Sequence, residues 1–348
     1  MNRRNFVRIT GGVLASLTAG PRSPSMSRGH EDVPALLAQG MTAMARAKNW
    51  FDAHWGAALI AGHYLCVDST IDEATRDAMR AELEVVLKTH AEAVRPFARD
   101  DADPQASTRI AKSLEPALEN GVRAHGHAVI YTALALRALG DAPTLAIPAI
   151  TNRICDWNRV ISKKKPAAPR HPAVSPTEKT RDPNPAVVSK KMLARRTFER
   201  LADFAPLVGH RHAPRPNFTH WTTHTEALIR LDALGSHQLA HKGLLGLRAH
   251  LEFDVPAVPR SDPIDRASVT RQALLDARWW RDDERRAQWH ETWNVRDNRN
   301  GDWIASGHLF KVLYAFTRLA CFVDDPRLVE TAAQVLFERY FDPLVGGG

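Results

Sequence analysis

Four stretches of the sequence place histidine beside aromatic or acidic residues where a strongly apolar run begins. They read His54-Trp55, His125-Gly126-His127, His220-Trp221 with His224, and Asp302-Trp303 with His308. Imidazole transfers protons near neutral pH, and indole faces stack on sugar rings and other flat apolar surfaces. Helix starts also offer free N–H groups to anionic or hydroxyl-rich molecules. The pattern predicts acid–base chemistry on a small hydroxyl-rich ligand.

Each residue type in these stretches suits a different role. Proton transfer is expected from His54, His127, His224 and His308, with Asp302 or Glu226 orienting or ionising them. Substrate contacts are expected from Trp55, Trp221, Trp303 and His125. The alternative is structural, because the same side chains can cap and staple helix starts with their polar tips in water.

Metal binding is a separate possibility, because two histidine pairs have the i, i+4 spacing that places both rings on one helical face. These pairs are His220 with His224, and His237 with His241. Gly235-Ser236 predicts a tight turn between two antiparallel helices, which separates the pairs by about 20 Å at 1.5 Å per residue. One shared site is therefore not expected, and if a metal binds, His220 and His224 are its candidate ligands.

The apolar pattern predicts an all-helical fold. Three ranges are apolar almost all the way round, as in buried helices: 54–67, 125–139 and 307–322. Ranges 73–95 and 326–340 instead carry one apolar stripe among charges, as in outer helices. No alternating strand pattern with hairpin turns is present.

About a dozen helices, alternating between inner and outer, favour a closed ring of helical hairpins, since one layer of buried helices must be covered by a second. The pattern resembles the α/α-toroid superfamily of six-hairpin glycoside hydrolases, sugar epimerases, polysaccharide lyases and terpenoid cyclases. Gly307-His308 and Asp324-Asp325-Pro326 look like the last hairpin of the sugar-epimerase branch. No catalytic motif of that superfamily is present. An irregular helical bundle is the alternative architecture.

Convergence of the histidines follows from the ring architecture. If inner and outer helices alternate, all inner helices point the same way and their N-termini gather on one rim. The four stretches would then line one pocket at that rim.

The charge of the chain is concentrated in two segments. The net charge is +8, of which residues 1–30 contribute +5 and residues 161–191 contribute +6, so the remainder is near −3. A basic docking face for nucleic acid is therefore not expected on the folded body. The Pro-rich range 161–191 is expected to be a solvated loop within a single helical domain, 31–348.

Residues 1–30 resemble a twin-arginine export signal. Arg3-Arg4 is followed by Phe6 and then by an apolar run of about 12 residues, which is too short to span a bilayer. We expect recognition by the twin-arginine export machinery and a periplasmic or secreted location. Proteins with this class of signal are exported already folded, often with a cofactor in place.

Two classes of enzyme and one non-enzymatic role are compatible with these features. The leading hypothesis is an exported enzyme that acts on a carbohydrate-like substrate by histidine and carboxylate chemistry. The second is a metal- or cofactor-dependent oxidoreductase, and the third is a non-catalytic binding or scaffold protein. The sequence identifies no particular cofactor and no oligomeric state.

Overall fold

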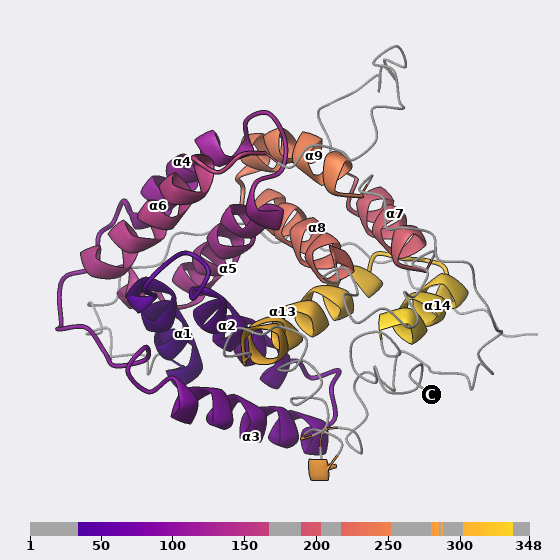
Figure 1. The fold of residues 1–348 in the computed structure, drawn as a ribbon, viewed down its shortest axis with the longest axis horizontal. Coiled ribbons are helices and arrows are strands. Elements are labelled where there is room, and N and C mark those ends of the chain that lie inside the picture. Colours follow the sequence, from indigo (N-terminus) through magenta and orange to yellow (C-terminus); the bar gives the residue numbers. More distant parts are fainter. Residues whose placement is uncertain are drawn as a thin grey trace, which may run out of the picture. The chain divides into compact units, whose positions relative to one another are not determined.

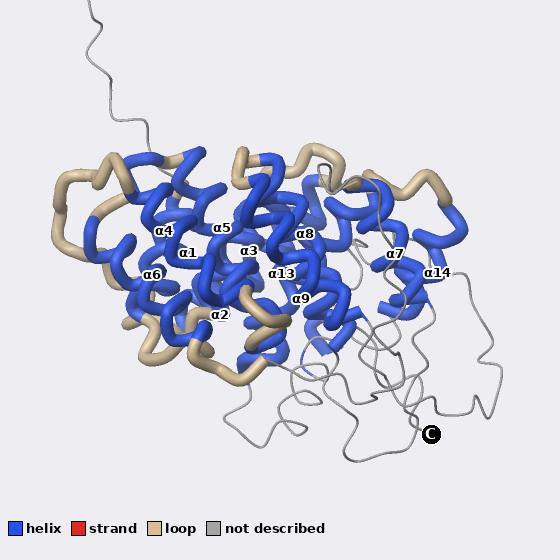
Figure 2. Tube along the Cα trace, turned by 90° about the horizontal axis from the view of Figure 1, so that it is seen from above, coloured by secondary structure: helices blue, strands red, loops and turns tan. Residues whose placement is uncertain are grey.

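The fold is all-helical in the part of the chain that the computed structural model describes. That part comprises residues 34–166, 189–202, 217–251, 280, 282–284, 287 and 302–336. It lies within one compact unit, Val33–Gly348; the separate unit Met1–Asp32 lies outside the described residues, together with the predicted signal. Figure 2 shows helices and loops there and no strand.

Eleven α-helices are described. They are α1 (Ala35–Arg46), α2 (His54–Cys66), α3 (Glu73–Thr89), α4 (Ala106–Leu114), α5 (His127–Asp141), α6 (Pro148–Ser162), α7 (Lys190–Ala202), α8 (Asn217–Ala233), α9 (His237–Leu251), α13 (Asp302–Ala320) and α14 (Pro326–Leu336). Short 3-10 turns occur at Glu115–Leu118, Ala124–Gly126 and Pro143–Leu145. None of the described helices is long and apolar enough to cross a membrane.

Four helices, α2, α5, α8 and α13, form the centre of the unit and are called the inner helices below. Each contacts the next in that order, and α13 contacts α2, so the four surround a common axis (Figure 1). Nearly every side chain of α2 and α5 is buried, as their apolar sequences predict. Helices α3, α4, α9 and α7 pack against inner helices from outside, which confirms the all-α class; the finer toroid assignment stays a prediction.

Local sequence explains where several helices begin. Asp72 caps α3 by accepting a 3.0 Å hydrogen bond from the backbone N–H of Thr75. Pro148 and Pro326 occupy the first helical positions of α6 and α14, where the missing N–H costs nothing. At α14, Asp325 also accepts from the backbone N–H of Leu328 at 3.2 Å.

Several predicted boundaries were wrong by a few residues. Helix α5 begins at His127 because His125 and Gly126 adopt positive φ angles of 54° and 80°, which an α-helix cannot contain. Helix α3 ends at Thr89 and is followed by turns, although the apolar stripe was predicted to continue to residue 95.

The other differences lie at helix ends. Helix α13 begins at Asp302 rather than at 307. The predicted loop 161–191 contributes its first residues to α6 and its last to α7, and residues 167–188 lie outside the described part.

Close packing between α1 and α2 depends on paired glycines. A Cβ on Gly56 would lie 2.3 Å from the backbone nitrogen of Met44 and 2.4 Å from the carbonyl oxygen of Gly40. Backbone atoms cannot move aside as a flexible side chain can. The two helix backbones therefore approach to a distance that only glycine permits, and this contact holds the start of α2 in place.

We predict that Gly56→Ala lowers the free energy of unfolding by at least about 1–3 kcal/mol, the usual cost of overpacking a core. Gly140→Ala is the matched control, because Gly140 is an exposed helical glycine with no atom within 4 Å of an added Cβ. It should be neutral or stabilising by about 0.5–1 kcal/mol. Urea denaturation of both variants measures this difference, and equal stability of the two would contradict the packing account.

Candidate metal centre

Four histidines meet where the inner helices begin. They are His54 at the start of α2, His127 at the start of α5, His220 in α8 and His308 in α13, and they are called the histidine cluster below. One ring nitrogen from each lies within 4.8 Å of the corresponding nitrogen of every other member. Three of the rings are almost inaccessible to solvent, and His220 is partly buried.

The rings of the histidine cluster follow the same circular order as the inner helices. The ring centroids are 4.4 Å apart for His54 and His127, and 4.9 Å apart for His127 and His220. They are 5.0 Å apart for His220 and His308, and 4.8 Å apart for His308 and His54. Each inner helix thus contributes one imidazole to a common centre.

Backbone carbonyl groups fix the tautomers of two cluster members. Nδ1 of His54 lies against the carbonyl oxygen of Phe51, and Nδ1 of His127 lies against that of Ala124. A carbonyl oxygen only accepts hydrogen bonds, so the tautomers in which Nδ1 carries the proton satisfy both carbonyl groups. The hydroxyl of Tyr131 lies 2.8 Å from Nδ1 of His54 and gives that nitrogen a second polar neighbour.

These tautomers leave Nε2 of both rings without a proton. The two Nε2 atoms are nevertheless only 2.8 Å apart, so their lone pairs face each other. Nε2 of His308 and Nε2 of His220 make a second close contact at 3.2 Å. In these tautomers a shared cation, either a proton or a metal ion, makes the first contact attractive.

Burial disfavours the proton as that cation. Removal from water lowers the pKa of His54 and of His127 well below the ordinary histidine range, and the nearby positive charge of Lys311 lowers both further. The pKa of His220 is also lowered well below that range, mainly by burial and then by the neighbouring histidines. These three histidines are therefore neutral near pH 7, the state in which imidazole binds metals.

Three further histidines form a second group beside the cluster. Nδ1 of His224 lies 3.2 Å from Nδ1 of His250, near the end of α9, so α8 and α9 are antiparallel as their tight turn predicts. The ring of His125 lies 4.9 Å from that of His220 and 6.0 Å from that of His250. A Cβ on Gly126 would lie 2.8 Å from the ring of His224, so glycine is needed there for space as well as for its φ angle.

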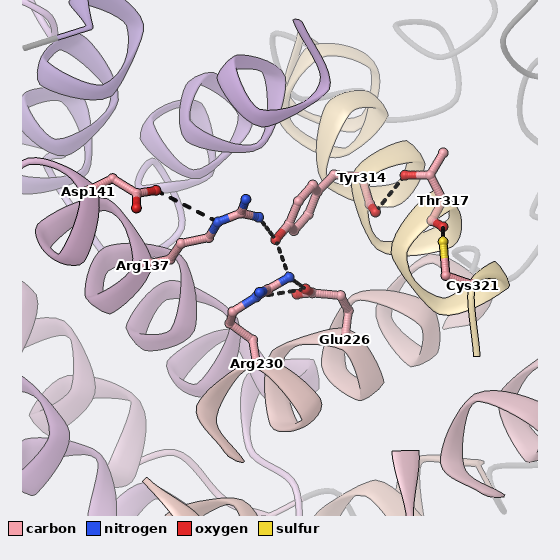
Figure 3. A network of polar contacts seen from close by, with 7 residues as sticks. All are labelled: Arg137, Asp141, Glu226, Arg230, Tyr314, Thr317 and Cys321. Atoms are coloured by element: carbon pink, nitrogen blue, oxygen red, sulfur yellow. Dashed lines mark hydrogen bonds and ion pairs between the residues drawn. The ribbon is translucent and has the colours of Figure 1, made fainter. Parts of the chain in front are cut away.

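A second polar layer crosses the inner helices further along their length. It contains Tyr64, Arg137, Arg230, Tyr314 and Glu226, and is called the arginine layer below. Figure 3 shows these residues except Tyr64. Arg230 donates to Glu226 at 2.9 Å and to the hydroxyl of Tyr314 at 3.1 Å, and Arg137 donates to the same hydroxyl. The Arg137 guanidinium also lies 3.3 Å from the centre of the Tyr64 ring.

The two layers show that the inner helices run in one direction. On α2, α5 and α8 the arginine-layer residue follows the histidine by ten positions, which is about 15 Å along a helix. These pairs are His54 and Tyr64, His127 and Arg137, and His220 and Arg230. On α13, Tyr314 also follows His308, so all four helices pass from the histidine cluster toward the arginine layer.

The structure brings only some of the predicted site residues together. His54, His127 and His308 lie in the cluster with His220, which the sequence indicated only as a possible metal ligand. His224 is not among the four residues of the cluster, and its Nδ1 lies beside that of His250 instead. Glu226 belongs to the arginine layer, where it pairs with Arg230.

The predicted aromatic contacts lie elsewhere. Trp55 stacks on His90 with ring centroids 4.3 Å apart, toward the outer helix α3. Trp221 lies near Arg200 of α7, with the guanidinium 5.4 Å from its ring centre. The side chains of Asp302 and Trp303 lie outside the described part of the structure.

Sequence analysis missed three residues near the cluster. Tyr131 follows His127 by one helical turn, Lys311 follows His308 by three residues, and His250 lies on the outer helix α9. Lys311 had a recognisable signal, because it is the only charge in the apolar run Leu309–Phe316. The contact of His250 with His224 depends on tertiary packing and had no such signal.

Comparison with protein-family models, with curated proteins and with solved structures finds no match for this chain.

We predict that the metal-free protein loses stability as the pH falls below about 6.5. Burial lowers the pKa of His224 to about 4, so between these values the unfolded chain binds a proton at this position that the folded chain does not. The contribution of His224 to stability is thus complete above pH 6.5 and is lost on acidification, on the order of 3 kcal/mol by pH 4.

Denaturation of the metal-free protein from pH 7.5 to 4.5 tests this prediction. His224→Gln should reduce the pH dependence of the free energy of unfolding by the share of one buried histidine, because the other buried histidines keep their contribution. His241→Gln is the control, because His241 is exposed on α9, and it should leave the dependence unchanged. Equal slopes for His224→Gln and the wild type would show that His224 is not held in its neutral form by burial.

Proposed function

We propose that the chain is a metal-dependent oxidoreductase whose histidine cluster binds one first-row transition-metal ion. The observation that carries this proposal is the 2.8 Å contact between Nε2 of His54 and Nε2 of His127, in rings whose Nδ1 atoms face carbonyl oxygens. Metal-ligating histidines typically donate their second ring N–H to such an acceptor. The same four rings offer nitrogen ligands of the kind that copper, iron, nickel and zinc accept.

The shorter of the two nitrogen contacts favours a redox-active metal over zinc. Two nitrogens bound at about 2.0–2.1 Å are separated by about 3.4 Å in a tetrahedral site and by about 2.9 Å when they subtend a right angle. The 2.8 Å contact is closer to the right-angle separation, whereas the 3.2 Å contact is closer to the tetrahedral one. Tetragonal nitrogen sites are typical of copper(II) and nickel(II), and they leave positions open along their axis.

The carbohydrate hypothesis receives less support from the described residues. Trp55 stacks on His90, Trp221 lies near Arg200, and Glu226 is engaged by Arg230. The indole ring of Trp50, which the sequence did not indicate, lies 5.5 Å from the ring of His127. The non-catalytic alternative requires structural histidines, for which an uncompensated contact between two lone pairs is unfavourable.

The N-terminal sequence is consistent with this proposal. Export in the folded state would allow the metal to be inserted before translocation, which suits a centre enclosed by four helices. We therefore include the twin-arginine signal, a periplasmic or secreted location and the toroid architecture in the proposal.

Two histidines on the same helix provide a matched test. His220→Gln should remove a ligand and weaken metal binding by more than tenfold, whereas His224→Gln, four residues along, should retain one metal ion per chain. His127→Ala should weaken binding as His220→Gln does. Elemental analysis of protein purified from its natural compartment, with circular dichroism to check folding, measures these outcomes.

Three results would count against the proposal. These are a wild-type protein without stoichiometric metal, a His220→Gln variant that keeps its metal, and equal losses in the His220 and His224 variants. Stoichiometric zinc would retain the site but overturn the assignment as an oxidoreductase.

A further inference from the structure

Lys311 is a buried cation next to the histidine cluster. Only 2% of the residue is exposed, and it lies three positions after His308 on α13, so both side chains belong to the same helical face. Its charge acts on His54 and on His127, which belong to two other inner helices. These relations place Lys311 on the inner side of α13, between the histidine cluster and the arginine layer.

No acidic partner balances Lys311 within the described residues. No hydrogen bond or ion pair joins it to any other residue in that part of the chain. The buried carboxylate on the neighbouring helix, Glu226, is already bound to Arg230. An isolated ammonium group is costly to bury, and burial accordingly lowers the pKa of Lys311 well below its usual range.

A metal ion in the cluster would increase this imbalance of charge. Four neutral imidazoles leave the full positive charge of the ion in place, and Lys311 adds a further positive charge when protonated. Tyr131 and Thr223 place hydroxyl groups one turn after the cluster histidines of their helices. The carboxylate whose charge acts on Tyr131, that of Asp52, makes no ion pair with Lys311.

We infer that Lys311 and the metal together bind a small oxyanion, such as a carboxylate or phosphate group, which names the substrate class of the proposed centre. This inference rests on the metal site proposed above. The anion would bind the metal and accept a hydrogen bond from Lys311 in its ammonium form, which places negative charge beside both cations. Charge-assisted hydrogen bonds of this kind are among the strongest in proteins.

Copper(II)-loaded protein provides the test, with acetate and phosphate as the probes. At constant ionic strength each anion is titrated while the electron paramagnetic resonance spectrum is recorded. We expect at least one of the two to change the copper signal saturably in the wild type. Whether acetate or phosphate changes the copper signal distinguishes a carboxylate ligand from a phosphate ligand.

Variants at position 311 separate the role of the amine from that of the metal. Lys311→Met should fold, because it replaces an unbalanced buried charge by an apolar chain of similar length, and it should retain copper. Its apparent affinity for the anion should fall at least tenfold. Lys311→Arg should retain part of the response, and Lys112→Met, an exposed lysine on α4, should leave it unchanged.

The possible failures are distinguishable. If the wild type does not bind copper, the proposed metal site is wrong. If it binds copper but neither anion alters the spectrum, the metal site stands and the anion inference is overturned. An unchanged affinity in Lys311→Met would likewise overturn the role of Lys311.

Discussion

The close contact between two imidazole nitrogens in the core is the interaction on which the proposed metal centre depends. The carbonyl groups of Phe51 and Ala124 hold the Nδ1 protons of His54 and His127, and the remaining Nε2 atoms are 2.8 Å apart in the core. Burial opposes protonation of either ring. The arrangement is stabilised when a metal ion accepts both lone pairs, and His220 and His308 complete a set of four such donors.

The helices maintain this contact through two polar layers along a common axis. At one end, turns before α2 and α5 supply the carbonyl acceptors; at the other, Arg137 and Arg230 share the hydroxyl of Tyr314. A buried, hydrogen-bonded ion pair such as Arg230 with Glu226 adds little net stability but is costly to disrupt. The arginine layer thus fixes the rotation and height of the inner helices, which brings their histidines into register.

The sequence predicted the helices and the convergence of their histidines better than it predicted the roles of individual residues. Apolar runs identified α2, α5 and α13, and the histidines at the first two starts marked the end at which the site lies. Side-chain direction was less predictable, because a few tens of degrees of helix rotation decide whether Trp55 faces the axis or the outer helix α3. His220 and His224 contact different groups of histidines, and this difference is likewise set by the packing of α8 against both α5 and α9.

X-ray absorption spectroscopy at the edge of the bound metal tests the central claim most directly. The account predicts copper or nickel with about four imidazole nitrogens at about 2.0–2.1 Å, and at most one or two further light ligands. A first shell of sulfur, or of oxygen with only one or two imidazoles, would contradict a centre built from His54, His127, His220 and His308.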